Sequence, residues 1–184
     1  MGNLVHCTVD RGVATVTLDS QENRNALSRG LLADLHAALD RTEADDVRAV
    51  VLTHAGPSFC AGADLKERRN GPADSTPMVD AMRRLSDHRV PTIAAVTGAV
   101  RAGGIGLMAS CDVVVVASAT TFAFTEVRIG VAPAIISVPI LRRVTPTALA
   151  MPFLTGAPFD AHEARRIGLV DVATDDVRAV VDHL

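Results

Sequence analysis

Two glycine-rich segments, each following a run of apolar residues, constrain the fold of this chain most strongly. The first comes after 47–53 and the second after 92–96. Continuous rather than alternating hydrophobicity is typical of a parallel strand that is covered on both faces. Small residues after such a strand allow a tight turn into a helix and let a ligand reach the main chain. The two segments therefore indicate either simple strand-to-helix turns or a site at which two turns converge.

The remaining patterns predict strands that alternate with helices. Alternation of apolar and polar residues on both sides of Arg11-Gly12 predicts a hairpin. Ser28 is expected to cap a helix, and the spacing of Met78, Met82 and Leu85 predicts another. The expected strands are 4–9, 13–18, 47–53, 92–96 and 113–117, and the chain from Ile135 onward is expected to be mostly helical. This order is typical of an α/β fold, which we expect to form one domain over residues 1–184.

Composition excludes several classes of partner. Aromatic residues make up 3% of the chain, without Trp or Tyr, so stacking surfaces for single-stranded nucleic acid are not expected. The net charge of −3 comes with scattered basic residues, which also argues against a duplex partner. Every apolar run is too short for a membrane helix, so we expect no membrane partner.

The cysteines and histidines predict neither disulfides nor a metal site. Cys7, Cys60 and Cys111 are far apart and form no C-x-x-C pair, which favours a reducing compartment. The N-terminus lacks the pattern of a signal peptide, so a cytoplasmic protein is expected. No two histidines have the spacing of a zinc site. His54 and Cys60 lack an orienting third group, so we interpret both as structural or incidental.

The second glycine-rich segment also resembles a dinucleotide-binding loop. Residues 104–109 match the pattern G-x-G-x-x-A. A dinucleotide fold, however, requires an acidic residue at the end of the next strand, and that strand is followed by Ser118. The preceding strand also ends too early, with Thr97 to Gly103 in between. The pattern is therefore a weak indication of nucleotide binding.

Several motifs resemble those of one known family. They are Arg24-Asn25-Ala26-Leu27, Phe59 to Glu67, Pro91 to Gly98 with Gly103-Gly104, Cys111-Asp112, Thr125-Glu126 and Leu154-Thr155-Gly156. Taken together, they resemble the crotonase (enoyl-CoA hydratase/isomerase) family from about Val13 to Val172. The resemblance implies a spiral of ββα units, a homotrimer or hexamer, and an acyl-CoA thioester as substrate, with no cofactor besides the coenzyme A of the substrate.

The resemblance also implies roles for individual residues. The backbone N–H groups of Ala63 and Gly103 would hold the thioester carbonyl oxygen in an oxyanion hole. The expected coenzyme A contacts are Arg24, Ala61, Asp64, Leu65 and Lys66. As an alternative, Arg24 and Lys66 are ordinary solvated surface charges.

The catalytic carboxylate is expected to be Glu126 alone. Two-carboxylate hydratases carry another Glu at the position that Gly106 occupies here, which resembles a single-Glu bacterial subgroup. One carboxylate can serve hydration of a 2-enoyl-CoA, and it suits double-bond isomerisation at least as simply. A catalytically lapsed acyl-CoA-binding or assembly subunit is a third possibility. Glu126 has a local alternative role as a helix N-terminal acid or as a partner of Arg128.

Two further expectations concern the pocket and the C-terminus. The acyl pocket is expected to be walled by 70–85 and 132–137, where Ala134-Ile135-Ile136 replaces a glycine-rich stretch of many relatives. This replacement should narrow or reshape the pocket. We also expect the helical C-terminal segment that completes trimers in the family to be largely absent, so that the helical C-terminal part is shortened.

Overall fold

The computed structural model describes residues 3–44, 46–68 and 74–184. The chain begins with the expected hairpin, in which β1 (Val5–Asp10) pairs antiparallel with β2 (Val13–Leu18). Arg11 and Gly12 connect the strands with φ of 48° and 83°, so both lie in the left-handed region. Two successive residues of positive φ give a turn whose twist matches that of the strands. The hairpin prediction is confirmed.

The hairpin continues into a six-stranded sheet with the order β1-β2-β3-β5-β7-β10. From β2 onward all neighbours are parallel. The further strands are β3 (Ala49–His54), β5 (Thr92–Val96), β7 (Val113–Ala117) and β10 (Val172–Thr174). The three continuous apolar runs are therefore buried parallel strands, as expected.

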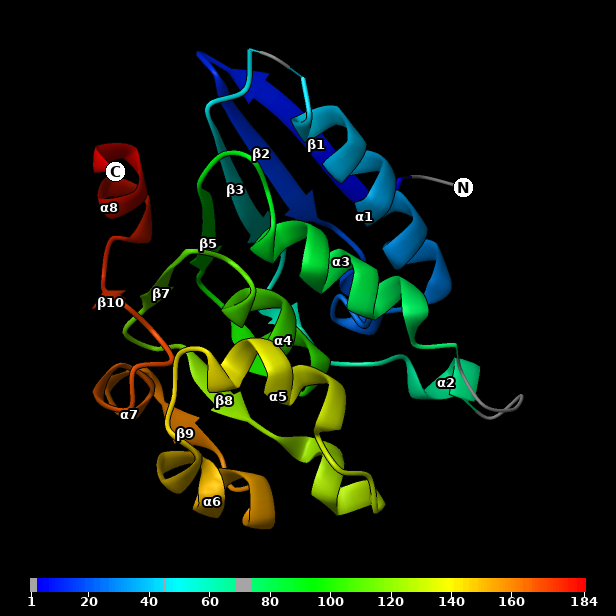
Figure 1. The fold of residues 1–184 in the computed structure, drawn as a ribbon, viewed down its shortest axis with the longest axis vertical. Coiled ribbons are helices and arrows are strands. Elements are labelled where there is room, and N and C mark those ends of the chain that lie inside the picture. Colours follow the sequence, from blue (N-terminus) through cyan, green and yellow to red (C-terminus); the bar gives the residue numbers. More distant parts are fainter. Residues whose placement is uncertain (1–2, 45, 69–73) are drawn as a thin grey trace.

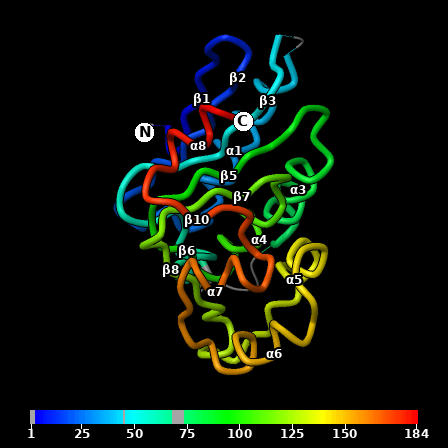
Figure 2. The backbone as a smooth tube through the Cα atoms, turned by 90° about the vertical axis from the view of Figure 1, so that its left-hand side faces the viewer, coloured from blue at the N-terminus to red at the C-terminus, as the bar shows by residue number. Residues whose placement is uncertain are grey.

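A second, four-stranded sheet has the order β4-β6-β8-β9. Its strands are β4 (Ser58–Cys60), β6 (Ala99–Arg101), β8 (Thr121–Ala123) and β9 (Phe159–Asp160). Figure 2 shows β6 and β8 on the side of the main strands toward α6 and α7. The sequence patterns missed these strands, because two or three residues are too few to show a period. Each long central strand is thus followed by a short strand of the second sheet, which produces the expected spiral.

Helices cover both faces of the main sheet (Figure 1). On one face pack α1 (Arg29–Thr42), α3 (Thr76–Ser86) and α4 (Gly103–Ala109), and the short α2 (Leu65–Arg68) precedes α3. The N–H of Leu31 donates to Ser28 Oγ at 3.2 Å, which confirms the predicted cap of α1. On the other face α8 (Val177–His183) packs on a smaller core that includes Val51, Ile93 and Val115. Burial on both faces explains why the central strands are apolar throughout.

The C-terminal third is less uniformly helical than expected. It contains α5 (Ala134–Leu141), α6 (Pro146–Thr155) and α7 (Ala161–Arg166). The strands β9 and β10 interrupt this series, so the prediction of a mostly helical segment was incomplete. Tertiary pairing with β8 and β7 makes strands of these short stretches. In the ranges that the structure describes, no helix has the length and apolar character needed to cross a membrane.

Candidate active site

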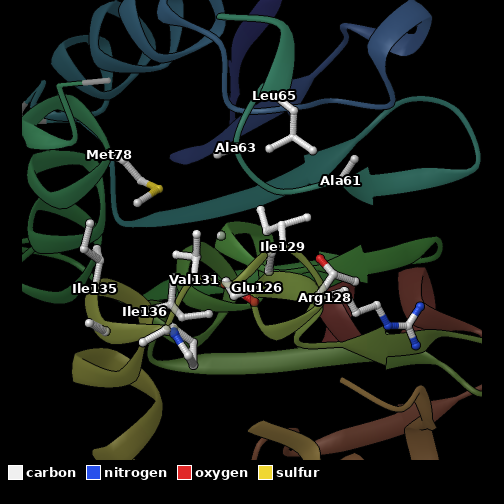
Figure 3. A pocket seen from close by; sticks show the side chains of 16 residues that line it. Ala61, Ala63, Leu65, Met78, Glu126, Arg128, Ile129, Val131, Ile135 and Ile136 are labelled. Carbon is white, nitrogen blue, oxygen red and sulfur yellow. The ribbon is translucent and has the colours of Figure 1, made fainter. Parts of the chain in front are cut away.

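A cavity of about 380 Å³ lies where the two glycine-rich loops meet the chain after β8. That chain forms a 3-10 helix, η2 (Thr125–Ile129), and then leads into α5. Figure 3 shows Glu126 in the middle of the cavity, with Met78 and Ile135 toward one end and Ala61 and Arg128 toward the other. The lining is apolar apart from a few groups; its residues are Ala61, Ala63, Leu65, Met78, Ala102, Gly103, Thr125, Glu126, Arg128, Ile129, 131–134, Ile135 and Ile136.

The two backbone amides predicted from the loops lie next to each other. The amide nitrogen of Ala63 is 3.8 Å from the point at which a Cβ would stand on Gly103. Gly103 is the first residue of α4, so its N–H has no acceptor one turn earlier within that helix. A side chain at position 103 would also press on Leu27 Cδ1 at 3.0 Å. Glycine therefore keeps the main chain of this loop open to the cavity.

Asn25 holds the first loop in place. Its side chain is fully buried and donates to the carbonyl oxygens of Ser58 at 2.8 Å and Ala55 at 3.2 Å. Its Oδ1 accepts the N–H of Ser20 at 2.6 Å. Asn25 has a φ of 54°, in the left-handed region that asparagine tolerates better than most residues. The motif containing Asn25 was recognised from the sequence, but its role in joining the hairpin to the loop was not.

Ala102 gives the second loop an uncommon backbone geometry. Its φ of 47° and ψ of −121° lie outside the usual regions for a residue with a side chain. The N–H of Ala102 donates to Ala123 O at 3.0 Å, and its carbonyl accepts the N–H of Ile105 at 2.8 Å. These two bonds turn the chain sharply from β6 into α4 and bring Gly103 to the cavity. Sequence reasoning missed this position, because alanine carries no signal for a positive φ.

Glu126 is half-buried and projects from η2 into the cavity. Gly130, with a φ of 70°, ends η2, and the N–H of Val131 donates to Glu126 O at 3.0 Å. Arg128 donates from its guanidinium to Gly156 O at 2.8 Å, which joins η2 to the end of α6. The cavity therefore brings the predicted carboxylate together with both predicted amides.

Gly106 lies directly under α5. A Cβ at this position would stand 2.6 Å from Ile136 Cγ2, 2.8 Å from Ile136 Cβ and 2.8 Å from Met82 Cε. Ile136 is 2% exposed, so it is part of the core as well as of the cavity wall. The space that a side chain at 106 would need is therefore filled by Ile136. Gly106 and the Ala134-Ile135-Ile136 stretch, noted separately in the sequence, form one packing unit.

Comparison with known proteins identifies the family. The sequence profile described as enoyl-CoA hydratase/isomerase matches residues 8–183. This chain belongs to the enoyl-CoA hydratase/isomerase family. A Thermus thermophilus protein provisionally named an enoyl-CoA hydratase is 41% identical over 173 residues, which cover 89% of this chain and 68% of that protein.

Solved structures of the family agree with the fold. A structure described as an enoyl-CoA hydratase from Mycobacterium avium has a TM-score of 0.89 at 44% identity and covers 100% of this chain and 74% of its own. A structure described as an enoyl-CoA hydratase from Mycobacterium smegmatis has a TM-score of 0.90 at 34% identity and covers 98% of this chain and 73% of its own. The expected crotonase-type α/β fold is thereby confirmed.

The coenzyme A contacts expected from the family resemblance divide into two groups. Ala61 and Leu65 line the cavity. Arg24, Asp64 and Lys66 are not among its lining residues but lie beside it along the chain. The N–H of Ala61 donates to Arg24 O at 3.0 Å, and the N–H of Lys66 donates to Asp64 Oδ1 at 2.8 Å. The side chains of Arg24 and Lys66 are exposed, which suits both phosphate contacts and ordinary surface charges.

Of the expected pocket walls, 132–136 lines the cavity, and from 70–85 Met78 does. Residues 70–73 lie outside the described residues. The expected pocket walls did not include Thr125, Ile129 and Val131, which line the cavity because η2 and the residues after it lie beside it.

The remaining candidate groups are consistent with structural roles. Burial raises the pKa of the Cys60 thiol to about 12, so it stays protonated at neutral pH. His54 packs edge-on against Phe59, with ring centroids 5.7 Å apart, and burial lowers its pKa. Within the described part of the chain, no three His, Cys, Asp or Glu side chains gather where a metal ion could be held.

Proposed function

We propose that this member of the enoyl-CoA hydratase/isomerase family adds water across the double bond of a 2-enoyl-CoA thioester. The observation that carries the proposal is the meeting of Glu126 with the amides of Ala63 and Gly103 in one largely apolar cavity. A carboxylate facing two backbone donors across an apolar space suits reactions that move a proton while charge builds on a carbonyl oxygen.

In the proposed reaction, the thioester oxygen accepts hydrogen bonds from the N–H groups of Ala63 and Gly103. Attack of the water oxygen on the β-carbon shifts the double-bond electrons toward that oxygen, so negative charge develops where the two donors point. Glu126 takes one proton from the attacking water and then delivers it to the α-carbon. The product is the 3-hydroxyacyl thioester, and Glu126 returns to its ionised form.

The same proposal assigns the coenzyme A portion to the end of the cavity near Ala61 and Leu65. Main-chain atoms around Ala61 to Asp64 would face the adenine, because small residues leave the backbone accessible there. Arg24 and Lys66 would contact the phosphates from exposed positions beside this end.

A second candidate is isomerisation between 3-enoyl and 2-enoyl thioesters. It is favoured by the packing of Ile136 over Gly106, which leaves no room for a second carboxylate at that position. Isomerisation needs one group that removes a proton from one carbon and returns it to another, and Glu126 would suffice.

We also propose a homotrimer or hexamer in the cytoplasm. Exposed apolar side chains on α6 support assembly, with Met151 69% and Leu154 74% exposed. The three buried free cysteines support a reducing compartment. Sedimentation analysis would test the assembly, and a monomer at micromolar concentration would contradict it.

The reaction is tested by following the absorbance of the conjugated enoyl thioester. Hydration of crotonyl-CoA should lower it, whereas isomerisation of a 3-enoyl-CoA should raise it. Glu126→Gln should reduce the rate on the order of 10² to 10⁴-fold, because amide nitrogen cannot serve as the base. Glu22→Gln, which changes an exposed Glu on the short 3-10 helix η1 (Gln21–Asn23), is the matched control and should retain the wild-type rate.

The outcomes separate the candidates. Loss of absorbance from crotonyl-CoA that depends on Glu126 supports hydration. Gain of absorbance from the 3-enoyl substrate without hydration supports isomerisation. Thioester binding without turnover of either substrate would refute both and favour a lapsed acyl-CoA-binding subunit.

A further inference from the structure

A second cavity, of about 450 Å³, lies beside the first along α3 and α5. Its walls include the apolar side chains of Val79, Met82, Val138 and Pro139, and its polar lining residues are Arg83, Ser86, Asp87, Ser110 and Arg142. No step of the proposed reaction uses this space. Its position one helical turn beyond the candidate active site raises the question of what separates the two.

The separation falls at Ile135. Among the described lining residues of the two cavities, Ile135 is the only one common to both. The flanking residues divide between them along the same two helices. On α3, Met78 lines the first cavity and Met82, one turn later, lines the second. On α5, Ile136 lines the first and Val138 the second.

Ile135, the residue that separates the two cavities, stands at the end of the first cavity toward which an acyl chain would extend. Figure 3 shows Met78 and Ile135 at the end opposite Ala61 and Arg128. Ala63 of the proposed carbonyl site lies between the two ends in Figure 3, and the coenzyme A portion is assigned to the Ala61 end. An acyl chain that extends from the carbonyl away from coenzyme A therefore meets Met78 and Ile135.

Neighbouring packing keeps Ile135 from moving aside. Ile135 is half-buried and packs against the main core. The next residue, Ile136, is 2% exposed and fits against Gly106, which anchors this turn of α5. Ile135 is also β-branched, so few rotamers are open to it in a helix. The distal part of an acyl chain could pass into the second cavity only if the side chain of Ile135 were shortened.

We propose that Ile135 determines substrate length by closing the acyl pocket, so that the site takes short acyl thioesters, and that shortening Ile135 opens the second cavity to the distal methylene groups of a longer chain. This inference rests on the proposed assignment of an acyl-CoA ligand to the first cavity. The apolar walls of the second cavity match such a tail, whereas its charged residues would remain solvated at the rim.

Binding of saturated thioesters tests the inference without turnover. The dissociation constants of butyryl-CoA and octanoyl-CoA would be measured by isothermal titration calorimetry. For the wild type, octanoyl-CoA should bind no more tightly than butyryl-CoA. For Ile135→Ala, octanoyl-CoA should gain about fourfold for each methylene admitted, hence at least tenfold, with butyryl-CoA little changed.

Two further variants keep the test sharp. Val138→Ala enlarges only the second cavity and leaves Ile135 in place. It should not increase the affinity for octanoyl-CoA relative to butyryl-CoA. Ile135→Val shortens the side chain by one methyl group and should give a smaller gain of the same sign, even if Ile135→Ala folds poorly. Circular dichroism would establish that each variant is folded.

Results of three kinds would overturn the proposal: wild-type protein that already prefers octanoyl-CoA tenfold, an Ile135→Ala profile equal to the wild type, or an equal gain in Val138→Ala. Failure of the proposed reaction would look different. It would appear as absent turnover of crotonyl-CoA while the length discrimination in binding persists.

Discussion

Replacing Gly106 with alanine should destabilise the protein, although alanine is ordinarily the better helix former. In an exposed helix the change would gain about 0.8 to 1 kcal/mol. Here the new methyl group would stand 2.6 Å from Ile136 Cγ2 and 2.8 Å from Ile136 Cβ. Met82 Cε is the end of a flexible side chain and can move, but Ile136 Cβ moves only with the backbone of α5. Overpacking of this kind costs about 1 to 3 kcal/mol.

The net effect expected for Gly106→Ala is a loss of up to about 2 kcal/mol in the free energy of unfolding, measured by urea denaturation. For a chain of this size that corresponds to a fall in Tm of up to about 8 °C. On an Ile136→Ala background, the same substitution should cost less than in the wild type, because the 2.6 Å contact with Cγ2 is gone while the 2.8 Å contact with Cβ remains. The coupling energy should be at least about 0.5 kcal/mol.

Ile136→Val is the matched control, since valine retains both Cβ and Cγ2 and leaves the clash in place. Gly106→Ala should cost as much on this background as in the wild type. The packing argument fails if Gly106→Ala stabilises the wild type, or if its cost is unchanged on the Ile136→Ala background.

Two other predictions follow from buried polar groups. Asn25→Ala should lower the free energy of unfolding by on the order of 3 kcal/mol, because three hydrogen bonds to Ser20, Ala55 and Ser58 are lost, and urea denaturation should show little change for the exposed Asn3→Ala. His54 has a pKa lowered by burial, so its contribution to stability should be complete above pH 6.5 and decline as the pH falls from there through its folded pKa. His54→Gln should flatten this part of the stability profile.

Each of these two predictions has an outcome that would contradict it. Equal stability of Asn25→Ala and Asn3→Ala would show that the buried amide contributes little to holding the loop. A pH dependence between 7.5 and 5 that is identical in wild type and His54→Gln would show that His54 titrates alike in the folded and unfolded chain.

Local patterns determined much of this protein. Alternation predicted the hairpin, a side-chain oxygen at Ser28 predicted the start of α1, and continuous apolar runs predicted the parallel strands. These features depend on neighbours within a few positions, so they can be read from the chain itself. The resemblance to a known family also predicted that the glycine-rich loops and Glu126 belong to one site, and residues of all three line the same cavity.

Tertiary structure decided the rest. The second sheet joins strands of two or three residues, whose pairing depends on partners 22 to 41 positions apart, as between Val100 and Phe122 or Ser58 and Ala99. Ala102 adopts a positive φ only because Ala123 and Ile105 hold its backbone. Gly106 owes its place to Ile136, 30 residues later along the chain. Ile135 gains its proposed role because α5 packs beside α3. Each of these depends on which distant atoms compete for the same space, a relation that sequence spacing alone does not contain.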